Sequence, residues 1–337
     1  MKINRIVVIG TSAGGMEALQ ELVAQLLPSF PAPIFIVQHM SHDGHAEVLA
    51  RALAKRGALP CAVVRNGERF KAGHIYVAAT DNHMLLKSRT VIVTKGAREN
   101  RYRPAIDPLF RSAAVAHGPR VISVVLTGLL DDGTEGTVAV KRCGGTTVVQ
   151  DPSDAEYPQM PASTLSAKVD HCVPLHELGS LLDRLARAPP AKRKAIPEDV
   201  KIEAIIAERV LSDIRAVNTL GKQVPYNCPG CGGVLWEMEK SRTVRYRCHV
   251  GHSYTRAALL AEQSGKIEET LWITLRMLEE RRNLLRSMRV KGAGAKSSIE
   301  REKDAEIHIE RIRGLLIAGG APNASGPKPT AIRSKRP

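Results

Sequence analysis

Aromatic residues and long apolar runs are both scarce in this chain. Phe, Trp and Tyr make up 4% of its 337 residues, whereas proteins that bind single-stranded nucleic acid commonly interleave aromatic and basic side chains. No apolar run approaches the roughly 18 residues that a membrane-spanning helix needs. The start, MKINRIVVIG, lacks the long apolar stretch of a secretory signal. We therefore expect a cytoplasmic protein that does not span a membrane and does not bind nucleic acid.

Cysteine and positive charge are both distributed unevenly along the chain. Three of the six cysteines stand alone, and the other three, Cys228, Cys231 and Cys248, lie close together. This spacing favours a reducing compartment and one metal site over a disulfide framework. Of the formal net charge of +15, residues 1–188 carry +4 and residues 189–337 carry +11. A basic half suits an anionic partner and equally suits solvated helices with a basic tail, so charge alone selects no function.

The pattern of apolar residues predicts two different halves. In residues 1–187, short β-branched runs alternate with amphipathic stretches, which predicts a doubly wound, mostly parallel α/β sheet with helices on both faces. The stretch 74–94 leaves no room for a helix and predicts an antiparallel hairpin at an edge. Residues 188–197, APPAKRKAIP, are typical of a linker. We then predict a helix and a small zinc-ribbon-like module over 198–256, a helical extension over 257–317 and a disordered tail over 318–337.

The turn GTSAGG follows the first predicted strand. A dinucleotide-binding fingerprint needs a second glycine where Ser12 stands. No Lys-Ser or Lys-Thr pair follows, which excludes a phosphate-binding P-loop. Gly10-x-Ser12-x-Gly14 instead matches the elbow that presents a serine nucleophile between a strand and a helix. A serine that only caps the helix is the alternative.

A serine nucleophile requires a base and an acid that orients the base. His39 ends the next predicted strand, and Asp131 and Asp132 follow the buried-type strand VISVVLTG. Because the carboxyl ends of neighbouring parallel strands share one edge of a sheet, we expect these side chains to line one crevice with Ser12. Other histidines, His83 among them, are expected at the surface.

Six stretches of the first half resemble the catalytic domain of the chemotaxis receptor methylesterase (CheB) family, in the family's order. They are VVIGTSAGG, IVQHM, HIYVAATDNHMLL, RPAIDPLFRSAA, VVLTGLLDDGTEG and QMPASTLSAK. The resemblance covers residues 1 to about 187. It implies that Ser12 is the nucleophile, His39 the base and Asp132 the orienting acid, with no cofactor for the chemistry. Asp131 stands where the family usually has asparagine, so it receives no catalytic role.

The resemblance also implies a substrate and partner. The family hydrolyses glutamyl γ-methyl esters on the cytoplasmic helices of methyl-accepting chemoreceptors, releasing methanol, and deamidates certain receptor glutamines. The chain starts at the first strand, so we expect no phosphorylatable receiver domain and expect residues 1–187 to hydrolyse ester unaided. The alternative is a catalytically degenerate scaffold whose basic, cysteine-bearing half binds nucleic acid or a signalling partner. The intact Ser/His/Asp set argues against that alternative.

The cysteine-bearing segment has the spacing of a metal site. Cys228-x-x-Cys231 is followed after sixteen residues by Cys248, with His249 and His252 close behind. Three thiolates and one imidazole suit tetrahedral zinc, although redox dithiols share the C-x-x-C motif. We expect His252 as the fourth ligand, because one turn or a tight loop lets it converge with Cys248, and keep His249 as the alternative. Since the hydrolase set is complete without a metal, this zinc is assigned a structural role.

Overall fold

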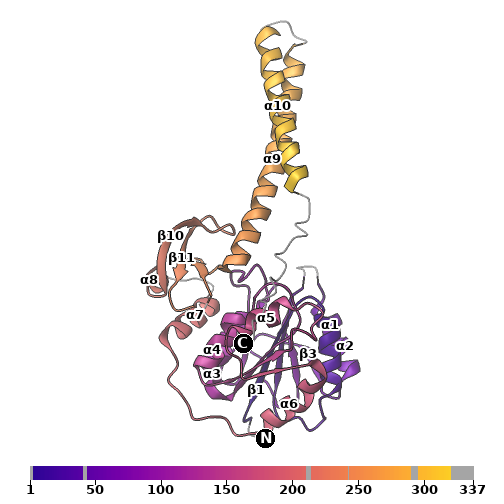
Figure 1. Ribbon diagram of the computed structural model, residues 1–337, viewed down its shortest axis with the longest axis vertical. Coiled ribbons are helices and arrows are strands. Elements are labelled where there is room, and N and C mark those ends of the chain that lie inside the picture. The colour runs from indigo at the N-terminus through magenta and orange to yellow at the C-terminus, as the bar shows by residue number, and fades with distance from the viewer. Residues whose placement is uncertain (1–2, 41–43, 210–213, 242, 290–294, 320–337) are drawn as a thin grey trace, which may run out of the picture. The chain divides into compact units, whose positions relative to one another are not determined.

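A seven-stranded parallel sheet lies at the centre of the N-terminal part of the chain (Figure 1). The computed structural model describes residues 3–40, 44–209, 214–241, 243–289 and 295–319. Contacts divide the chain into two units, Met1–Leu260 and Ala261–Pro337. The parallel sheet and the cysteine-bearing module belong to the same unit. The disordered tail was predicted over 318–337, and residues 320–337 of it lie outside the described residues.

The strands of the parallel sheet follow the order β3-β4-β2-β1-β7-β8-β9. They are β1 (Ile6–Thr11), β2 (Ile34–Gln38), β3 (Cys61–Val63), β4 (Ile75–Val77), β7 (Val121–Val125), β8 (Thr146–Gln150) and β9 (His171–Val173). Every residue of β1, β2 and β7 is buried, as near-continuous apolar strands inside a parallel sheet require. The predicted doubly wound α/β fold is confirmed.

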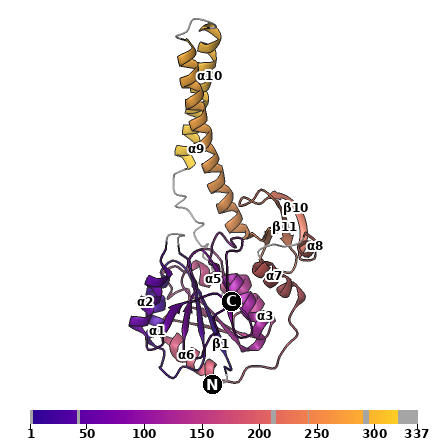
Figure 2. The ribbon, with the colours of Figure 1, turned by 180° about the vertical axis from the view of Figure 1, so that it is seen from behind.

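Helices cover both faces of this sheet (Figures 1 and 2). Val7 and Ile9 of β1 pack with one group of helices, and Ile6 and Val8 pack with the other, because successive side chains of a strand point to opposite faces. The first group is α1 (Gly15–Ala24), α2 (Ala46–Arg56) and α6 (Leu175–Arg187); the second is α3 (Ile106–His117), α4 (Thr134–Arg142) and α5 (Gln159–Leu165). A short 3-10 helix, Gly118–Arg120, precedes β7.

The hairpin predicted over residues 74–94 is only partly right. Its first strand, β4, lies inside the parallel sheet between β3 and β2, and only β5 (His83–Leu86) and β6 (Val91–Thr94) form an antiparallel pair. That pair is a separate sheet packed against α3. All three residues of β4 are buried, which explains its place inside a parallel sheet rather than in a hairpin.

After the linker, two helices lead into a small antiparallel sheet. The helices are α7 (Glu198–Arg209) and α8 (Ile214–Asn218), and the strands are β10 (Gly221–Asn227), β11 (Val234–Met238), β12 (Arg245–Cys248) and β13 (Ser253–Thr255). We call residues 221–255 the cysteine module. Trp236 packs between its sheet and the helices and donates from Nε1 to Asn218 Oδ1 at 2.7 Å. Trp236 therefore serves the core of the module.

Two long helices follow the cysteine module, as predicted. α9 (Arg256–Arg289) begins at the end of the first unit, and α10 (Ala295–Gly319) lies in the second. Within the second unit, Arg286 of α9 pairs with Glu306 of α10 at 2.7 Å, and Leu275 and Ile309 are buried. In the parts of the chain that the structure describes, no helix combines the length and the apolar character needed to cross a membrane.

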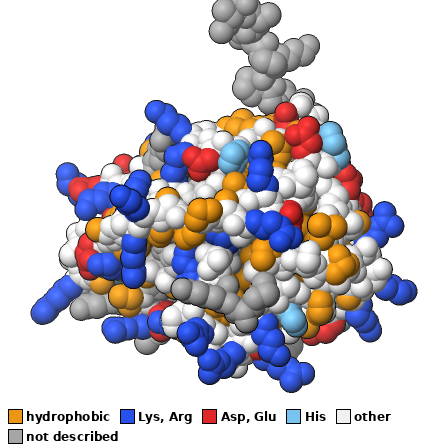
Figure 3. Space-filling view, turned by 90° about the horizontal axis from the view of Figure 1, so that it is seen from below, with side chains coloured by type: hydrophobic (Ala, Val, Ile, Leu, Met, Phe, Trp, Pro, Cys, Tyr) orange, Lys and Arg blue, Asp and Glu red, His pale blue; other side chains and the backbone are white. Residues whose placement is uncertain are grey.

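Basic side chains are dispersed on the face seen in Figure 3. Lys and Arg alternate there with acidic, apolar and uncharged side chains. The described part of this face therefore carries no continuous basic patch of the kind that an extended nucleic-acid backbone follows.

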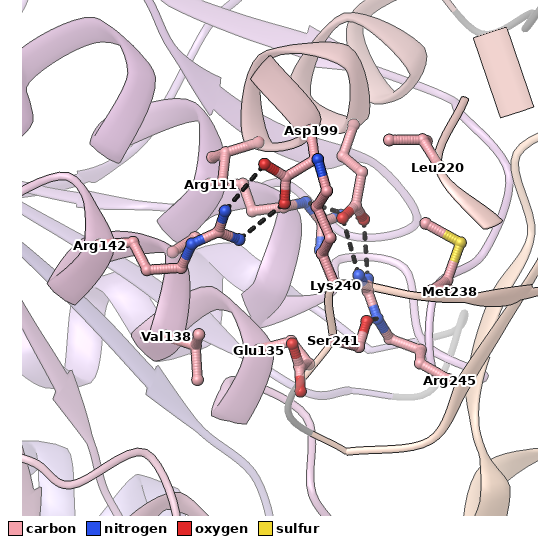
Figure 4. Close-up of a pocket in the computed structure, with 13 residues that line it drawn as sticks. Arg111, Glu135, Val138, Arg142, Asp199, Leu220, Met238, Lys240, Ser241 and Arg245 are labelled. Atoms are coloured by element: carbon pink, nitrogen blue, oxygen red, sulfur yellow. Dashed lines mark hydrogen bonds and ion pairs between the residues drawn. The ribbon is translucent and has the colours of Figure 1, made fainter. Parts of the chain in front are cut away.

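Ion pairs fasten the cysteine module and α7 to the helices of the parallel sheet, and Figure 4 shows one of them, between Arg142 of α4 and Asp199 of α7. Glu203 of α7 accepts two hydrogen bonds from Arg245, at 2.7 and 2.8 Å, and one from Arg247 at 3.1 Å. Arg111 of α3 approaches the same carboxylate at 3.8 Å. Burial alone would raise the pKa of Glu203, but these arginines hold it well below its usual range. The cavity beside the cluster measures about 20 Å³, which suits a water molecule and not a substrate.

Replacing Glu203 by Gln is expected to destabilise the first unit by about 3–5 kcal/mol, because it leaves three buried arginines with too little negative charge. Glu208→Gln on the same helix is the matched control. Its partner, Lys87, is exposed, and such pairs contribute about 1 kcal/mol or less. Urea unfolding followed by circular dichroism measures both. Equal midpoints for the two variants would show that the buried cluster does not stabilise the docked module.

Candidate functional site

Ser12, His39 and Asp132 lie at the same edge of the parallel sheet. Ser12 follows β1, His39 follows β2, and Asp132 lies in the loop after β7. Because β2 and β7 are the two neighbours of β1 and run parallel to it, their carboxyl ends converge at one crevice. Ser12 and His39 each retain 8% of their surface, and Asp132 retains 1%. The fold thus brings the three sequence-predicted residues together.

The turn that carries Ser12 is held from both neighbouring loops. The Ser12 N–H donates to Thr127 O at 3.0 Å, and the Gln38 Nε2 donates to Ser12 O at 2.7 Å. Gly14 caps α1 with a φ of 71°, a conformation that favours glycine. At Gly128 a Cβ would lie only 2.8 Å from Ser12 Cβ. The two glycines therefore allow the tight turn and the close approach of the next loop.

His39 is bonded on one side and open on the other. Its Nε2 lies 2.8 Å from Asp132 Oδ2, and since an ionised carboxylate only accepts, Nε2 is the donor and Nδ1 carries the lone pair. Within the described residues Nδ1 is buried without a hydrogen-bond partner. The Tyr102 ring stacks on the imidazole with centroids 3.6 Å apart, and its hydroxyl interacts with Ser12. Nδ1 is therefore the ring nitrogen whose lone pair is available to accept a proton.

Asp132 is surrounded by donors. Its Oδ2 also accepts from the Ile106 N–H at 2.7 Å, and its Oδ1 accepts from the Gly133 N–H at 3.0 Å and from Asn100 Nδ2 at 2.9 Å. Burial by itself would raise the pKa of Asp132, but the hydrogen bond and charge of His39 hold it below its usual value. Asp132 is thus a buried negative charge that is hydrogen-bonded to the imidazole.

Two other aspartates near Asp132 have different environments. Burial, followed by the charge of Asp132, raises the pKa of Asp107, which accepts from the Gly136 N–H at 2.7 Å. Asp131 accepts from Thr255 Oγ1 of the cysteine module at 2.9 Å, and burial raises its pKa to about 6. Of the pair Asp107 and Asp132, the negative charge therefore lies on Asp132, and Asp131 faces the module.

Sequence reasoning missed Asn100, Tyr102 and Asp107. All three lie in the segment ENRYRPAID, residues 99–107, which lacks a periodic apolar pattern and runs into the start of α3. The expectation that His83 lies at the surface was wrong, because it is 1% exposed and its Nε2 bonds Ala97 O at 2.9 Å. Burial lowers the pKa of His83. It packs beside the segment rather than facing solvent.

The cysteine module brings three thiols and one imidazole together. The ligand atoms of Cys228, Cys231, Cys248 and His252 all lie within 4.8 Å of one another. Two sulfurs bound to one tetrahedral zinc lie about 3.8 Å apart, and a sulfur and a nitrogen about 3.6 Å. Cys231 Sγ lies 3.7 Å from Cys248 Sγ, which lies 3.6 Å from His252 Nδ1. The donor set therefore fits a tetrahedral metal ion.

The surroundings of this cluster also suit a metal. The Tyr254 hydroxyl lies 3.5 Å from Cys228 Sγ, as an outer-shell partner of a thiolate does. The hydrogen bond with the neighbouring thiol of Cys248 is the largest of the effects that lower the pKa of Cys228. His249 is not in the cluster, and its ring packs edge-on against Trp236 with centroids 6.5 Å apart. The imidazole in the cluster is that of His252.

Known proteins match the N-terminal half of this chain. A family model described as CheB methylesterase matches residues 7–182. Protein-glutamate methylesterase/protein-glutamine glutaminase 3 of Anaeromyxobacter dehalogenans (strain 2CP-C) is 36% identical over 185 residues, covering 54% of this chain and 53% of that protein. A relative in Leptospira interrogans is 38% identical over 181 residues, covering 53% of this chain and 93% of that protein.

A solved structure is similar as well. The crystal structure of the Thermotoga maritima CheB methylesterase catalytic domain matches with a TM-score of 0.53 and 34% identity, over 54% of this chain and 98% of that one. The chain spans about half the length of the Anaeromyxobacter relative. The matches lie in the half that carries Ser12, His39 and Asp132, and this chain belongs to the CheB methylesterase family.

Proposed function

We propose that this chain is a serine-type protein-glutamate methylesterase that hydrolyses glutamyl γ-methyl esters of chemoreceptors in the cytoplasm, with glutamine deamidation as a second activity. The observation that carries the proposal is the 2.8 Å bond between His39 Nε2 and Asp132 Oδ2 beside Ser12. It is supported by the relatives, whose names include both activities. An ordered set of nucleophile, base and acid favours hydrolysis over the binding function that the sequence left as an alternative.

The chemistry needs only these side chains and the backbone. His39 Nδ1 takes the Ser12 proton as the hydroxyl oxygen attacks the γ-carbonyl carbon. The proton then passes to the leaving methoxide, and methanol departs as the acyl-enzyme forms. Water, activated by the same imidazole, attacks the acyl carbon and releases the glutamate side chain. Asp132 holds the imidazole in the required tautomer and stabilises its protonated form throughout.

The oxyanion of the tetrahedral intermediate requires backbone donors. The N–H groups of Ser12, Gly128 and Leu130 are committed to Thr127 O, Tyr157 O and Gln159 Oε1, at 3.0, 2.9 and 3.2 Å. We assign the role to the N–H groups of Ala13 and Leu129, the neighbours of these committed donors. Such donors typically contribute about 3–4 kcal/mol to the stabilisation of the transition state.

The test is release of methanol from membranes that carry chemoreceptors with labelled methyl esters. Full-length protein is expected to release labelled methanol with no cofactor added. If no methanol appears but Ser12 reacts with a fluorophosphonate, the chain is a serine hydrolase of another ester. If Ser12 is also unreactive, the binding function is the better description.

We further propose that the cluster of Cys228, Cys231, Cys248 and His252 holds one structural zinc ion. Purified protein is expected to contain about one zinc per chain, because three thiolates and an imidazole complete a tetrahedral site. Cys231→Ser should lose it, as measured by elemental analysis. Cys172→Ser, at an exposed cysteine outside the cluster, is the control and should keep it. Equal zinc content in the two variants would contradict the assignment.

A further inference from the structure

The segment Glu99–Tyr102 connects the candidate active site with the cysteine module. The Asn100 N–H donates to Ser253 O at 2.7 Å, and the Ser253 N–H donates to Arg98 O at 3.4 Å. Glu99 and Ser253 also form a parallel β-bridge. The backbone of the segment is therefore held alongside β13, the last strand of the module.

The Asn100 side chain spans the same junction. Its Nδ2 donates to Asp132 Oδ1 at 2.9 Å and to Asp107 Oδ2 at 3.1 Å, while its Oδ1 accepts from the Thr255 N–H at 3.2 Å. Asn100 is 2% exposed, so its side chain is closed to solvent. Its φ of 50° lies in the left-handed region, which asparagine tolerates better than most residues.

Glu99 fixes the segment through buried charges. Its carboxylate accepts from Arg111 of α3 and, at 3.1 Å, from Arg247 Nη2 of β12. Arg247 also donates to Gly251 O at 3.0 Å, in the turn between Cys248 at the end of β12 and His252 just before β13. The turn that closes the metal cluster and the segment that carries Asn100 are thus joined by one hydrogen-bonded network.

We propose that Asn100 is a positioning residue for Asp132, and that the cysteine module keeps Asn100 in place. This rests on the proposed serine-hydrolase function. The module is then part of the esterase site rather than an appendage to it. The sequence led us to expect that residues 1–187 hydrolyse ester unaided. If the module holds Asn100 in place, these residues should instead need the module for full activity, and loss of the structural zinc should slow catalysis.

Asn100→Gly tests the first part in the full-length chain. Glycine keeps the left-handed backbone and removes the amide. We expect kcat and the rate at which a fluorophosphonate labels Ser12 to fall about ten- to a hundredfold, since a hydrogen bond to a charged group is lost, with KM unchanged. The carboxylate of Asp132, with one donor fewer, becomes a stronger base, so the acid limb of kcat/KM should move to higher pH.

Lys168→Gly is the matched control, because Lys168 also has a positive φ, of 53°, and an exposed side chain away from the site. Its rates and pH profile should equal those of the wild type. An Asn100→Gly variant with a native circular dichroism spectrum, rates within threefold of the wild type and an unmoved acid limb would overturn the positioning role.

Cys231→Ser and zinc chelation test the contribution of the module. We expect both to lower the labelling rate and to speed hydrogen exchange in residues 98–103, where the Asn100 N–H is bonded to β13. The double variant Asn100→Gly/Cys231→Ser should be no slower than Asn100→Gly, because both changes act through one contact. The coupling would be overturned if the double variant lowered the labelling rate by the product of the two single effects, or if hydrogen exchange in residues 98–103 were unchanged.

Labelling also separates this inference from the proposed substrate. Wild-type protein that labels at Ser12 but releases no methanol removes the receptor ester as substrate, and the labelling rates still decide the role of Asn100. Wild-type protein whose Ser12 does not label overturns both.

Discussion

Ser12→Ala is expected to lower methanol release by about 10⁴-fold or more, since the members of a triad act as a unit and the rest of the site provides only residual catalysis. The loss should appear in kcat, measured with labelled receptor membranes. The fold should persist, because the backbone bonds of Ser12 to Thr127 and Gln38 do not involve the removed hydroxyl.

The control for this variant is Ser180→Ala, at an exposed serine of α6 whose hydroxyl bonds only the Glu177 carbonyl of its own helix in the described structure. It should match the wild type. If Ser12→Ala retained a tenth of the wild-type kcat, the nucleophile would have to be another group, and the assignment of the whole site would be wrong.

Asp132→Asn should cost nearly as much, about 10⁴-fold in kcat. An asparagine cannot accept from all the donors that converge on Asp132, and its neutral amide cannot stabilise the protonated imidazole. The measurement is again kcat for methanol release, made over a range of pH. Recovery of activity at high pH would be consistent with the loss of an orienting charge rather than of the fold.

The neighbouring Asp131→Asn variant is the matched control and should stay within about threefold of the wild type, since asparagine can still accept from Thr255 and Asp131 makes no bond to His39. The pKa of Asp131, raised to about 6, also predicts a sign for stability. A raised carboxyl pKa favours the folded state at low pH, and this contribution is lost as the pH rises through about 6. Above that pH, Asp131→Asn should be at least as stable as the wild type. A greater loss of activity in Asp131→Asn than in Asp132→Asn would reverse the assignment of the two aspartates.

Much of the fold could be predicted from local patterns. The buried parallel strands are runs of apolar residues long enough to be seen in isolation, and their alternation with amphipathic helices leaves few topologies. β4 was misplaced because a three-residue apolar strand looks the same in a hairpin and in a parallel sheet. Only its two neighbours, β3 and β2, decide between them, and these are set by the tertiary fold.

The candidate site also has a part that the sequence predicts and a part that it does not. Ser12, His39 and the aspartates after β7 end strands, so topology alone places them together. Asn100 and Tyr102 reach the site from an irregular segment, and Asn100 is held there by backbone atoms of Ser253 and Thr255, more than 150 residues away in the chain. Backbone donors and acceptors have no signature in a sequence, so this contact could not have been anticipated.

The buried ion pair between Glu99 and Arg247 has a consequence for exchanging parts among relatives, because it depends on the side chains of both segments. A C-terminal domain that is joined only by a flexible linker can be replaced or deleted at that linker without changing the catalytic domain. Here a chimera that takes its cysteine module from another member must also take a compatible segment 98–103. The natural unit of recombination is therefore a discontinuous pair of segments, one on each side of α3, rather than everything that follows residue 188.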